Sequence, residues 1–92
     1  MANFTIFETN RFQKDLTEDF QGQQKKIYTK LTEFVYPQLR ENPYLGKNIK
    51  KLVNWKPDTW RYRIGNYRFF YIIDEKKKIV FMITAEHRRN VY

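Results

Sequence analysis

The chain has 92 residues, no cysteine, one histidine and a net charge of +8. Its length predicts a single domain over residues 1–92, and its cysteine and histidine content excludes disulfides, thiolate metal sites and a histidine-based zinc site, so no metal or other cofactor is expected. It shows neither a signal-peptide pattern nor the ~20 consecutive apolar residues of a membrane span, which predicts a soluble cytoplasmic protein with no membrane partner.

The first half of the chain predicts one strand followed by two helices. The β-branched and aromatic segment 4–7 is typical of a strand, and Asn10 is the expected N-cap of the helix that follows it. Gly22 ends the apolar periodicity of that helix. A second helix is predicted from Gln23, and Pro37 is expected to kink or end it. The inward residues of the two helices are expected to be Phe12, Leu16, Phe20, Ile27, Leu31, Phe34 and Val35.

The second half of the chain predicts strands throughout. A short strand is expected at 50–53, and two longer strands at 59–64 and 67–73 are joined by the two-residue turn 65–66. The last strand, 78–85, is a nearly continuous apolar run, which is typical of a central or well-covered strand. The order of elements predicts an α+β fold in which two N-terminal helices pack on one face of a small antiparallel β-sheet.

The hairpin around the turn carries its arginines on one face. A two-residue turn fixes the register, so that Arg63 lies opposite Arg68 across the two strands. Like charges at such a pair destabilise a sheet by a few tenths of a kcal/mol up to about 1 kcal/mol, which favours an anion bound between them. The alternative is that each arginine pairs with a carboxylate such as Glu86 or Glu41. Alternation places Trp60, Tyr62, Ile64, Tyr67, Phe69 and Tyr71 on the face under the helices, and Arg61, Arg63, Arg68 and Phe70 on the other.

The net positive charge lies entirely in the second half of the chain. Residues 1–46 carry equal numbers of basic and acidic side chains, so the excess of +8 belongs to residues 47–92. This separation favours a polyanion such as RNA or DNA as the ligand, with simple solubility as the alternative. His87 is the natural proton carrier near neutral pH, although a lone histidine after a strand is more often a surface residue. Further candidate contacts to the ligand are Lys47, Lys50, Lys51, Arg88, Arg89 and Tyr92.

Several segments together resemble the RelE/ParE toxin superfamily of type II toxin–antitoxin systems. They are the sequence YRIGNYRFFY at 62–71, the Asp-Glu turn at 74–75, the apolar strand that follows and the ending HRRNVY at 87–92. The resemblance covers essentially the whole chain and implies a helical pair packed on a small antiparallel sheet. It implies either of two activities: the RelE branch cleaves mRNA in the ribosomal A site, and the ParE branch poisons DNA gyrase.

The resemblance also implies roles for individual residues. Arg61 and Arg63 match two basic positions on the third strand of the family, and Arg68 matches the arginine of its Tyr-Arg motif. The family's C-terminal proton donor falls on His87 or Arg88, and His87 is the expected donor, with Arg88 as the alternative. Its terminal tyrosine, which stacks on and orients the scissile nucleotide, falls on Tyr92. Because the pKa of an arginine is too high for a general base, the base is expected to be Glu86 or His87.

The ribonuclease activity is the one that the arginine-rich hairpin and the terminal histidine and tyrosine favour. The chain is therefore expected to be a ribosome-dependent mRNA endoribonuclease, an mRNA interferase, that uses the ribose 2′-hydroxyl and no metal. Arg68, with Arg63, is expected to stabilise the charge that develops on the phosphorus. A gyrase poison and a basic RNA-binding module without catalysis are the alternatives. The implied partner is a small acidic antitoxin, held with the toxin in a hetero-oligomer.

Overall fold

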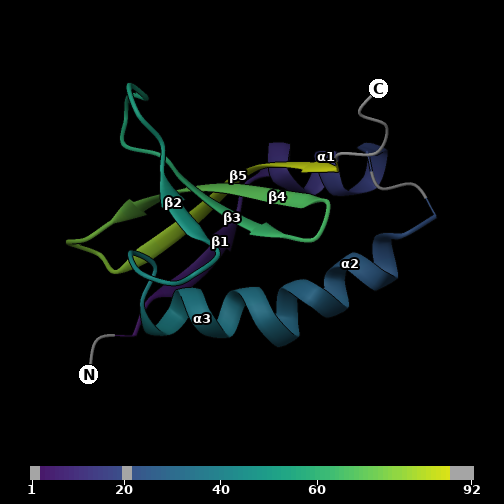
Figure 1. Ribbon diagram of the computed structural model, residues 1–92, viewed down its shortest axis with the longest axis horizontal. Coiled ribbons are helices and arrows are strands. Elements are labelled where there is room, and N and C mark those ends of the chain that lie inside the picture. The colour runs from purple at the N-terminus through teal and green to yellow at the C-terminus, as the bar shows by residue number, and fades with distance from the viewer. Residues whose placement is uncertain (1–2, 20–21, 88–92) are drawn as a thin grey trace.

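The computed structural model describes residues 3–19 and 22–87. It is an α+β fold in which helical segments lie against a five-stranded sheet (Figure 1). No helix among the described residues has the length and apolar character to cross a membrane. The elements are β1 (Thr5–Glu8), α1 (Asn10–Asp19), α2 (Gln24–Lys30), the π-helical turn η1 (Leu31–Val35), α3 (Tyr36–Glu41), β2 (Ile49–Lys51), β3 (Trp60–Ile64), β4 (Tyr67–Asp74) and β5 (Ile79–His87).

The sheet is mixed rather than antiparallel, which corrects the prediction from the sequence. Its strand order is β1-β5-β4-β3-β2. β1 runs parallel to β5, with Thr5 opposite Ile79, whereas the other neighbouring strands are antiparallel. The helices between β1 and β2 carry the chain across the sheet, so the first strand ends beside the last. The order of elements along the sequence does not determine whether β1 and β5 run parallel or antiparallel.

One core lies between the helices and one face of the sheet, as predicted. The side chains of Tyr62, Phe69 and Tyr71 are buried against it from the sheet. The hydroxyl of Tyr71 donates a hydrogen bond of 2.8 Å to the carbonyl oxygen of Pro43, which satisfies the polar end of a fully buried ring. The helical residues of the core are Phe12, Leu16, Ile27, Leu31, Val35, Tyr36 and Leu39.

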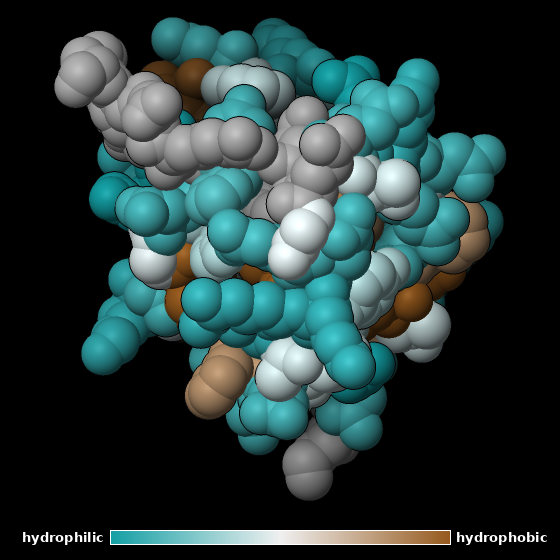
Figure 2. Space-filling model, turned by 90° about the vertical axis from the view of Figure 1, so that its right-hand side faces the viewer, coloured by the Kyte–Doolittle hydropathy of each residue, from teal (hydrophilic) through white to brown (hydrophobic). Residues whose placement is uncertain are grey.

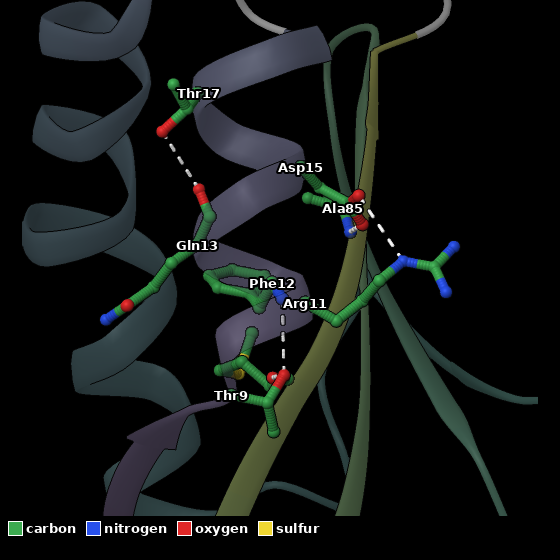
Figure 3. Close-up of polar contacts among 8 residues, drawn as sticks. Thr9, Arg11, Phe12, Gln13, Asp15, Thr17 and Ala85 are labelled. Carbon is green, nitrogen blue, oxygen red and sulfur yellow. Dashed lines mark hydrogen bonds and ion pairs between the residues drawn. The ribbon is translucent and has the colours of Figure 1, made fainter.

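Helix α1 begins one residue earlier than predicted, with Thr9 rather than Asn10 as its cap. The hydroxyl oxygen of Thr9 accepts a hydrogen bond from the backbone N–H of Phe12 at 3.2 Å, which is the N-cap contact (Figure 3). The same hydroxyl donates to the carbonyl oxygen of Met82 on β5 at 2.8 Å. A threonine here caps the helix and ties its start to the sheet, whereas Asn10 lies inside the helix.

Helix α1 also provides a hydrogen-bond acceptor for the backbone of β5 beyond the last residue of that strand that pairs with β1. The carboxylate of Asp15 accepts a hydrogen bond of 3.1 Å from the backbone N–H of Ala85, and Arg11 lies 3.5 Å from the other carboxylate oxygen (Figure 3). The Ala85 residue is almost fully buried. A buried N–H without an acceptor is unfavourable, so Asp15 holds the C-terminal half of β5 in place.

The second helical segment continues through Pro37 instead of ending near it. α2, η1 and α3 follow one another without a break, and the backbone N–H of Tyr36 donates to the carbonyl oxygen of Leu31, five residues earlier. This wide turn is followed by Pro37 in the first turn of α3, where its missing N–H matters least. Phe34 was expected to face the core but is 54% exposed. The buried stripe instead passes through Leu31, Val35 and Leu39, four residues apart.

The hairpin of β3 and β4 has the register that the sequence predicted. Arg63 lies opposite Arg68, and Tyr62 opposite Phe69. Gly65 takes φ +58, the left-handed value that the first position of such a turn requires, whereas Asn66 does not have a positive φ. Glycine is therefore needed at only one of the two turn positions.

Candidate nucleic-acid interface

The face of the sheet opposite the helices, which we term the outer face, carries the arginines of the hairpin. Alternation along β3 and β4 buries Tyr62 and Phe69 in the core and turns Arg61, Arg63 and Arg68 to the outer face. The β2–β3 loop projects from the sheet on the side away from α2 and α3 (Figure 1). The predicted grouping of the three arginines on one side of the sheet is confirmed.

The three arginines differ in how far the protein neutralises them. Nη1 of Arg68 lies 3.8 Å from a carboxylate oxygen of Glu86, its neighbour across β4 and β5. Half of the Glu86 side chain is exposed, so this long ion pair is weak. Within the described part of the chain, no carboxylate lies within 4.0 Å of the guanidinium of Arg61 or Arg63. Pairing with an internal carboxylate therefore applies to Arg68 alone among these residues.

A cationic pocket of about 430 Å³ lies at one end of this face, between β2 and the β3–β4 turn. Lys50 is directly opposite Arg61 across β2 and β3, and both side chains line the pocket together with Arg63. Nε of Arg61 is enclosed by protein atoms and has no acceptor among the described residues. The complete lining is Lys47, Asn48, Ile49, Lys50, Arg61, Arg63 and Gly65. Four basic side chains around one hollow make it electrostatically complementary to phosphate groups.

Lys51 is not part of this pocket. Its ammonium group lies 3.3 Å from the carboxylate of Asp58 and 5.7 Å from the ring centroid of Trp60. Trp60 packs against the core, on the face opposite Lys50 and Arg61. Alternation along β2 thus separates the two adjacent lysines, and only Lys50 shares the face of the arginines.

His87 is not brought together with the arginines either. It lies directly opposite Tyr67 across β4 and β5, and the two rings stack with centroids 4.7 Å apart and planes 22° apart. The hydroxyl of Tyr67 donates to the side chain of Gln23 at 2.7 Å, so this stack belongs to the helix side of the sheet. Glu86, one residue earlier, lies opposite Arg68 and shares the arginine face.

Three of the candidate residues lie outside the described residues. They are Arg88, Arg89 and Tyr92. Two other features of the outer face were not predicted from the sequence. Asn48 lines the pocket, and the ring of Trp55 stacks on that of Phe70. The sequence signal that could have identified Trp55 is a large aromatic residue in a polar, proline-containing loop, because such a residue does not contribute to a hydrophobic core.

The surface around the β3–β4 turn is suited to a charged ligand. Seen from that end of the molecule, the surface is mostly hydrophilic, with small apolar patches (Figure 2). Residues 3–19 and 22–87 contain no group of three histidine, aspartate or glutamate side chains placed to hold a metal ion. Near the β3–β4 turn, the charged groups of this face are the guanidinium and ammonium groups of the pocket, Arg68 and the carboxylate of Glu86.

Comparisons with known proteins give the family of the chain. Residues 6–92 match the family model described as the ParE toxin of type II toxin–antitoxin systems, parDE. Toxin RelG of Mycobacterium tuberculosis is 27% identical over 85 residues, which are 91% of this chain and 94% of the relative.

Solved structures agree with this assignment. A chain of a RelBE toxin–antitoxin complex from Mycobacterium tuberculosis superposes with a TM-score of 0.77 at 25% identity, covering 98% of this chain and 97% of that one. A chain of the archaeal RelE–RelB complex from Pyrococcus horikoshii has the same fold, with a TM-score of 0.73 at 23% identity over 99% of this chain and 100% of the other. The chain belongs to the RelE/ParE superfamily and is a toxin of a type II toxin–antitoxin system.

Proposed function

We propose that this toxin is a cytoplasmic endoribonuclease that cleaves mRNA in the ribosomal A site. The observation that carries the proposal is the pair of Arg63 and Arg68, directly opposite one another on the outer face beside Glu86 and the cationic pocket. Two like charges at this position oppose folding but suit a phosphorane, whose negative charge grows as the reaction proceeds. The similarity to a protein named toxin RelG, together with the resemblance of the hairpin to the RelE branch, supports this proposal.

The reaction needs a base, a cation and an acid around one phosphodiester. The base removes the proton of the ribose 2′-hydroxyl, and the 2′-oxygen then bonds to phosphorus. The bond from phosphorus to the 5′-oxygen breaks, and the acid gives that oxygen a proton. The products are a 2′,3′-cyclic phosphate and a free 5′-hydroxyl, and no metal takes part.

Glu86 is the base in this proposal. Its carboxylate is 3.8 Å from Arg68 and shares the outer face with Arg63. A carboxylate can accept a proton at neutral pH, which the guanidinium groups around it cannot do because they are protonated already. Arg68 and Arg63 then stabilise the developing charge without needing to exchange a proton.

The proton donor is assigned to Arg88 rather than to His87. The imidazole of His87 stacks on Tyr67 on the helix side of the sheet, away from Glu86 and the arginines. Arg88 lies outside the described residues, so this assignment rests on the resemblance to the family, whose C-terminal proton donor falls on His87 or Arg88. Tyr92 is assigned to stacking on the scissile nucleotide, also from the sequence.

The remaining basic residues hold the RNA backbone. Arg61, Lys50 and Lys47 line the pocket and contact phosphates on one side of the scissile bond. Arg89, which lies outside the described residues, is assigned to the RNA backbone from the sequence alone. Lys51, already paired with Asp58, contributes less than its neighbour.

An acidic antitoxin is the proposed partner, as in the RelBE complexes whose toxin chains share this fold. The outer face offers it a basic surface and, at the β1 edge, an exposed apolar ring: Phe7 is 52% exposed and packs against Phe81 with centroids 5.6 Å apart. A partner with acidic side chains and a few apolar ones fits both features. Affinity purification from the native host is expected to recover a small acidic protein, and recovery of none contradicts this part of the proposal.

Gyrase poisoning is the second candidate, because the family model that matches the chain carries the name ParE. Primer extension on mRNA from cells that express the toxin separates the two. We expect 5′ ends that map within codons of translated messages. Intact messages together with gyrase-dependent DNA breaks would assign the protein to the other branch.

A further inference from the structure

An exposed tryptophan lies over the outer face beside the cationic pocket. The ring of Trp55, in the β2–β3 loop, stacks on that of Phe70 with centroids 6.1 Å apart and planes 19° apart. Phe70 is only 9% exposed, whereas Trp55 is 49% exposed. One face of the indole thus covers Phe70, and much of the rest of the ring is open to solvent.

The loop that carries Trp55 is fastened at its base. The ammonium group of Lys51 lies 3.3 Å from the carboxylate of Asp58. The backbone N–H of Leu52 donates to the carbonyl oxygen of Thr59 at 2.9 Å, and the hydroxyl of Thr59 donates to that of Pro57 at 2.9 Å. With its ends held and its ring resting on Phe70, Trp55 needs little further ordering to bind a flat ligand.

The stack is directly next to the basic side chains. Phe70 lies opposite Arg61 across β4 and β3, and Arg61 lies opposite Lys50 across β3 and β2. The pair of Arg63 and Arg68 is two residues further along the same strands. Neighbouring strands are about 4.8 Å apart, and two residues along a strand span about 7 Å, which are distances that one nucleotide bridges between its phosphate and its base.

We propose that Trp55 is a stacking platform for an unpaired base of the RNA whose backbone the arginines hold. This inference rests on the proposed ribonuclease function and adds a binding residue to it. Aromatic rings bind unpaired bases through their faces, and every base has such a face. The simpler role for Trp55 is to shield Phe70 from water, and the two roles predict different behaviour on substitution.

The test uses single-turnover cleavage of mRNA on programmed ribosomes by the full-length toxin. In a series of messages, one nucleotide at a time around the scissile phosphate is replaced by an abasic ribonucleotide, which keeps the charge and removes the base. Each message is cleaved by the wild type and by the variants Trp55→Ala, Trp55→Leu and Trp55→Phe. Val53→Ala is the matched control, because Val53 is in the same loop, is 75% exposed and has no aromatic face.

We expect Trp55→Ala to slow cleavage of the intact message by about 5- to 150-fold, the range that stacking on one base corresponds to. The wild type should cleave one of the abasic messages more slowly than the intact message by a similar factor. Trp55→Ala should cleave that abasic message and the intact message at the same rate, because both changes remove the same contact. Trp55→Phe should restore most of the rate. Trp55→Leu, which covers Phe70 without offering an aromatic face, should not, and Val53→Ala should cleave as the wild type does.

Two results overturn the inference while leaving the ribonuclease function in place. One is a wild-type rate for Trp55→Leu with a slow rate for Trp55→Ala, which is the pattern of a cover for Phe70. The other is additive slowing by Trp55→Ala at every abasic position. A wild-type protein that cleaves none of the messages removes the proposed function and this inference with it. Melting temperatures of all variants identify any that fail to fold, and Trp55→Phe keeps the test decisive if Trp55→Ala is one of them.

Discussion

Arg63 of β3 and Arg68 of β4 face each other directly across the hairpin, on the side of the sheet that the helices leave open. The two residues differ in their surroundings: Arg68 has Glu86 at 3.8 Å, whereas Arg63 is exposed and lines the cationic pocket. The pair therefore has one guanidinium that is positioned by a carboxylate and one that remains available to a ligand.

Removal of either arginine should weaken cleavage more than it weakens folding. Arg63→Ala and Arg68→Ala are each expected to lower the rate of mRNA cleavage by about 10²–10³, the usual effect of removing one preorganised charge. Because relief of like-charge repulsion is favourable, Arg63→Ala should leave the free energy of unfolding unchanged or raise it by up to about 1 kcal/mol. Cleavage assays and urea denaturation measure the two effects. Lys51→Ala is the control, and equal loss of rate in that variant contradicts the assignment.

Substitution of Glu86 should change the pH dependence of cleavage as well as its rate. Glu86→Gln keeps the size of the side chain but cannot accept a proton, so the rate should fall and its rise with pH at the acidic end of the profile should disappear. The ion pair with Arg68 is long and half exposed, so its loss should cost about 1 kcal/mol of stability or less. A pH profile of Glu86→Gln that is parallel to the wild-type profile would assign the base elsewhere.

The two candidate proton donors can be separated by a pair of variants. His87→Phe keeps an aromatic ring to stack on Tyr67 and removes the titratable group, so it is expected to fold and to cleave at nearly the wild-type rate. Arg88→Ala is expected to cleave at least ten times more slowly, in line with the loss of a positioned acid of about 10²–10⁴-fold. The reverse pattern returns the role of donor to His87.

The hydrogen bond from Ala85 to Asp15 should be a large local contribution to stability. Asp15→Ala leaves a buried backbone N–H without its acceptor, which is expected to cost about 1–3 kcal/mol in the free energy of unfolding. Arg11 is the matched control, because its side chain is 73% exposed and contacts the same carboxylate from outside. Arg11→Ala should cost about 1 kcal/mol or less. Urea denaturation of both variants, followed by circular dichroism, makes the comparison.

Stability should fall in alkaline solution partly because of Tyr28. Its hydroxyl donates to the carboxylate of Glu8 at 2.9 Å, and burial together with this acceptor raises the pKa of Tyr28 from 10.0 to about 12. Between pH 10 and 12 the unfolded chain loses the phenolic proton while the folded chain retains it, so the free energy of unfolding decreases as the pH rises.

Tyr28→Phe removes this effect and should have a smaller fall in melting temperature between pH 8 and pH 11 than the wild type. The hydroxyl of Tyr36 donates to the other oxygen of Glu8, and its pKa is also raised by burial, so part of the alkaline loss should remain in this variant. Glu8→Gln, which keeps an acceptor but removes its charge, should show an intermediate effect. Identical curves for the wild type and Tyr28→Phe would exclude this source of alkaline instability.

The features that were predicted from the sequence are those that local chemistry determines. The register of the hairpin follows from a two-residue turn with glycine at its first position, and the positions of Arg61, Arg63 and Arg68 follow from that register. Lys50 and Arg61 were both expected to contact the ligand, although their pairing across β2 and β3 depended on a strand whose limits were uncertain.

The features that were missed depend on distant parts of the chain. The parallel pairing of β1 with β5 involves residues that are 74 positions apart, and no local signal reports the direction of such a pair. The face of the sheet on which His87 lies could not be predicted from the sequence for two reasons. β5 is central and apolar on both faces, and the register between β4 and β5 shifts at Phe70 and Tyr71. Pro37 lies within a helix because a π-helical turn precedes it, which depends on packing rather than on propensity.

The parallel pairing of β1 with β5 also limits when this protein can fold during its own synthesis. Thr5–Glu8 leave the ribosome early, but the strand to which they pair, residues 79–82, is made about seventy residues later. Until then the helices have only part of a sheet to pack on, and β4 lacks the neighbour that brings Glu86 beside Arg68. A nascent chain therefore lacks a complete outer face until β5 has been made.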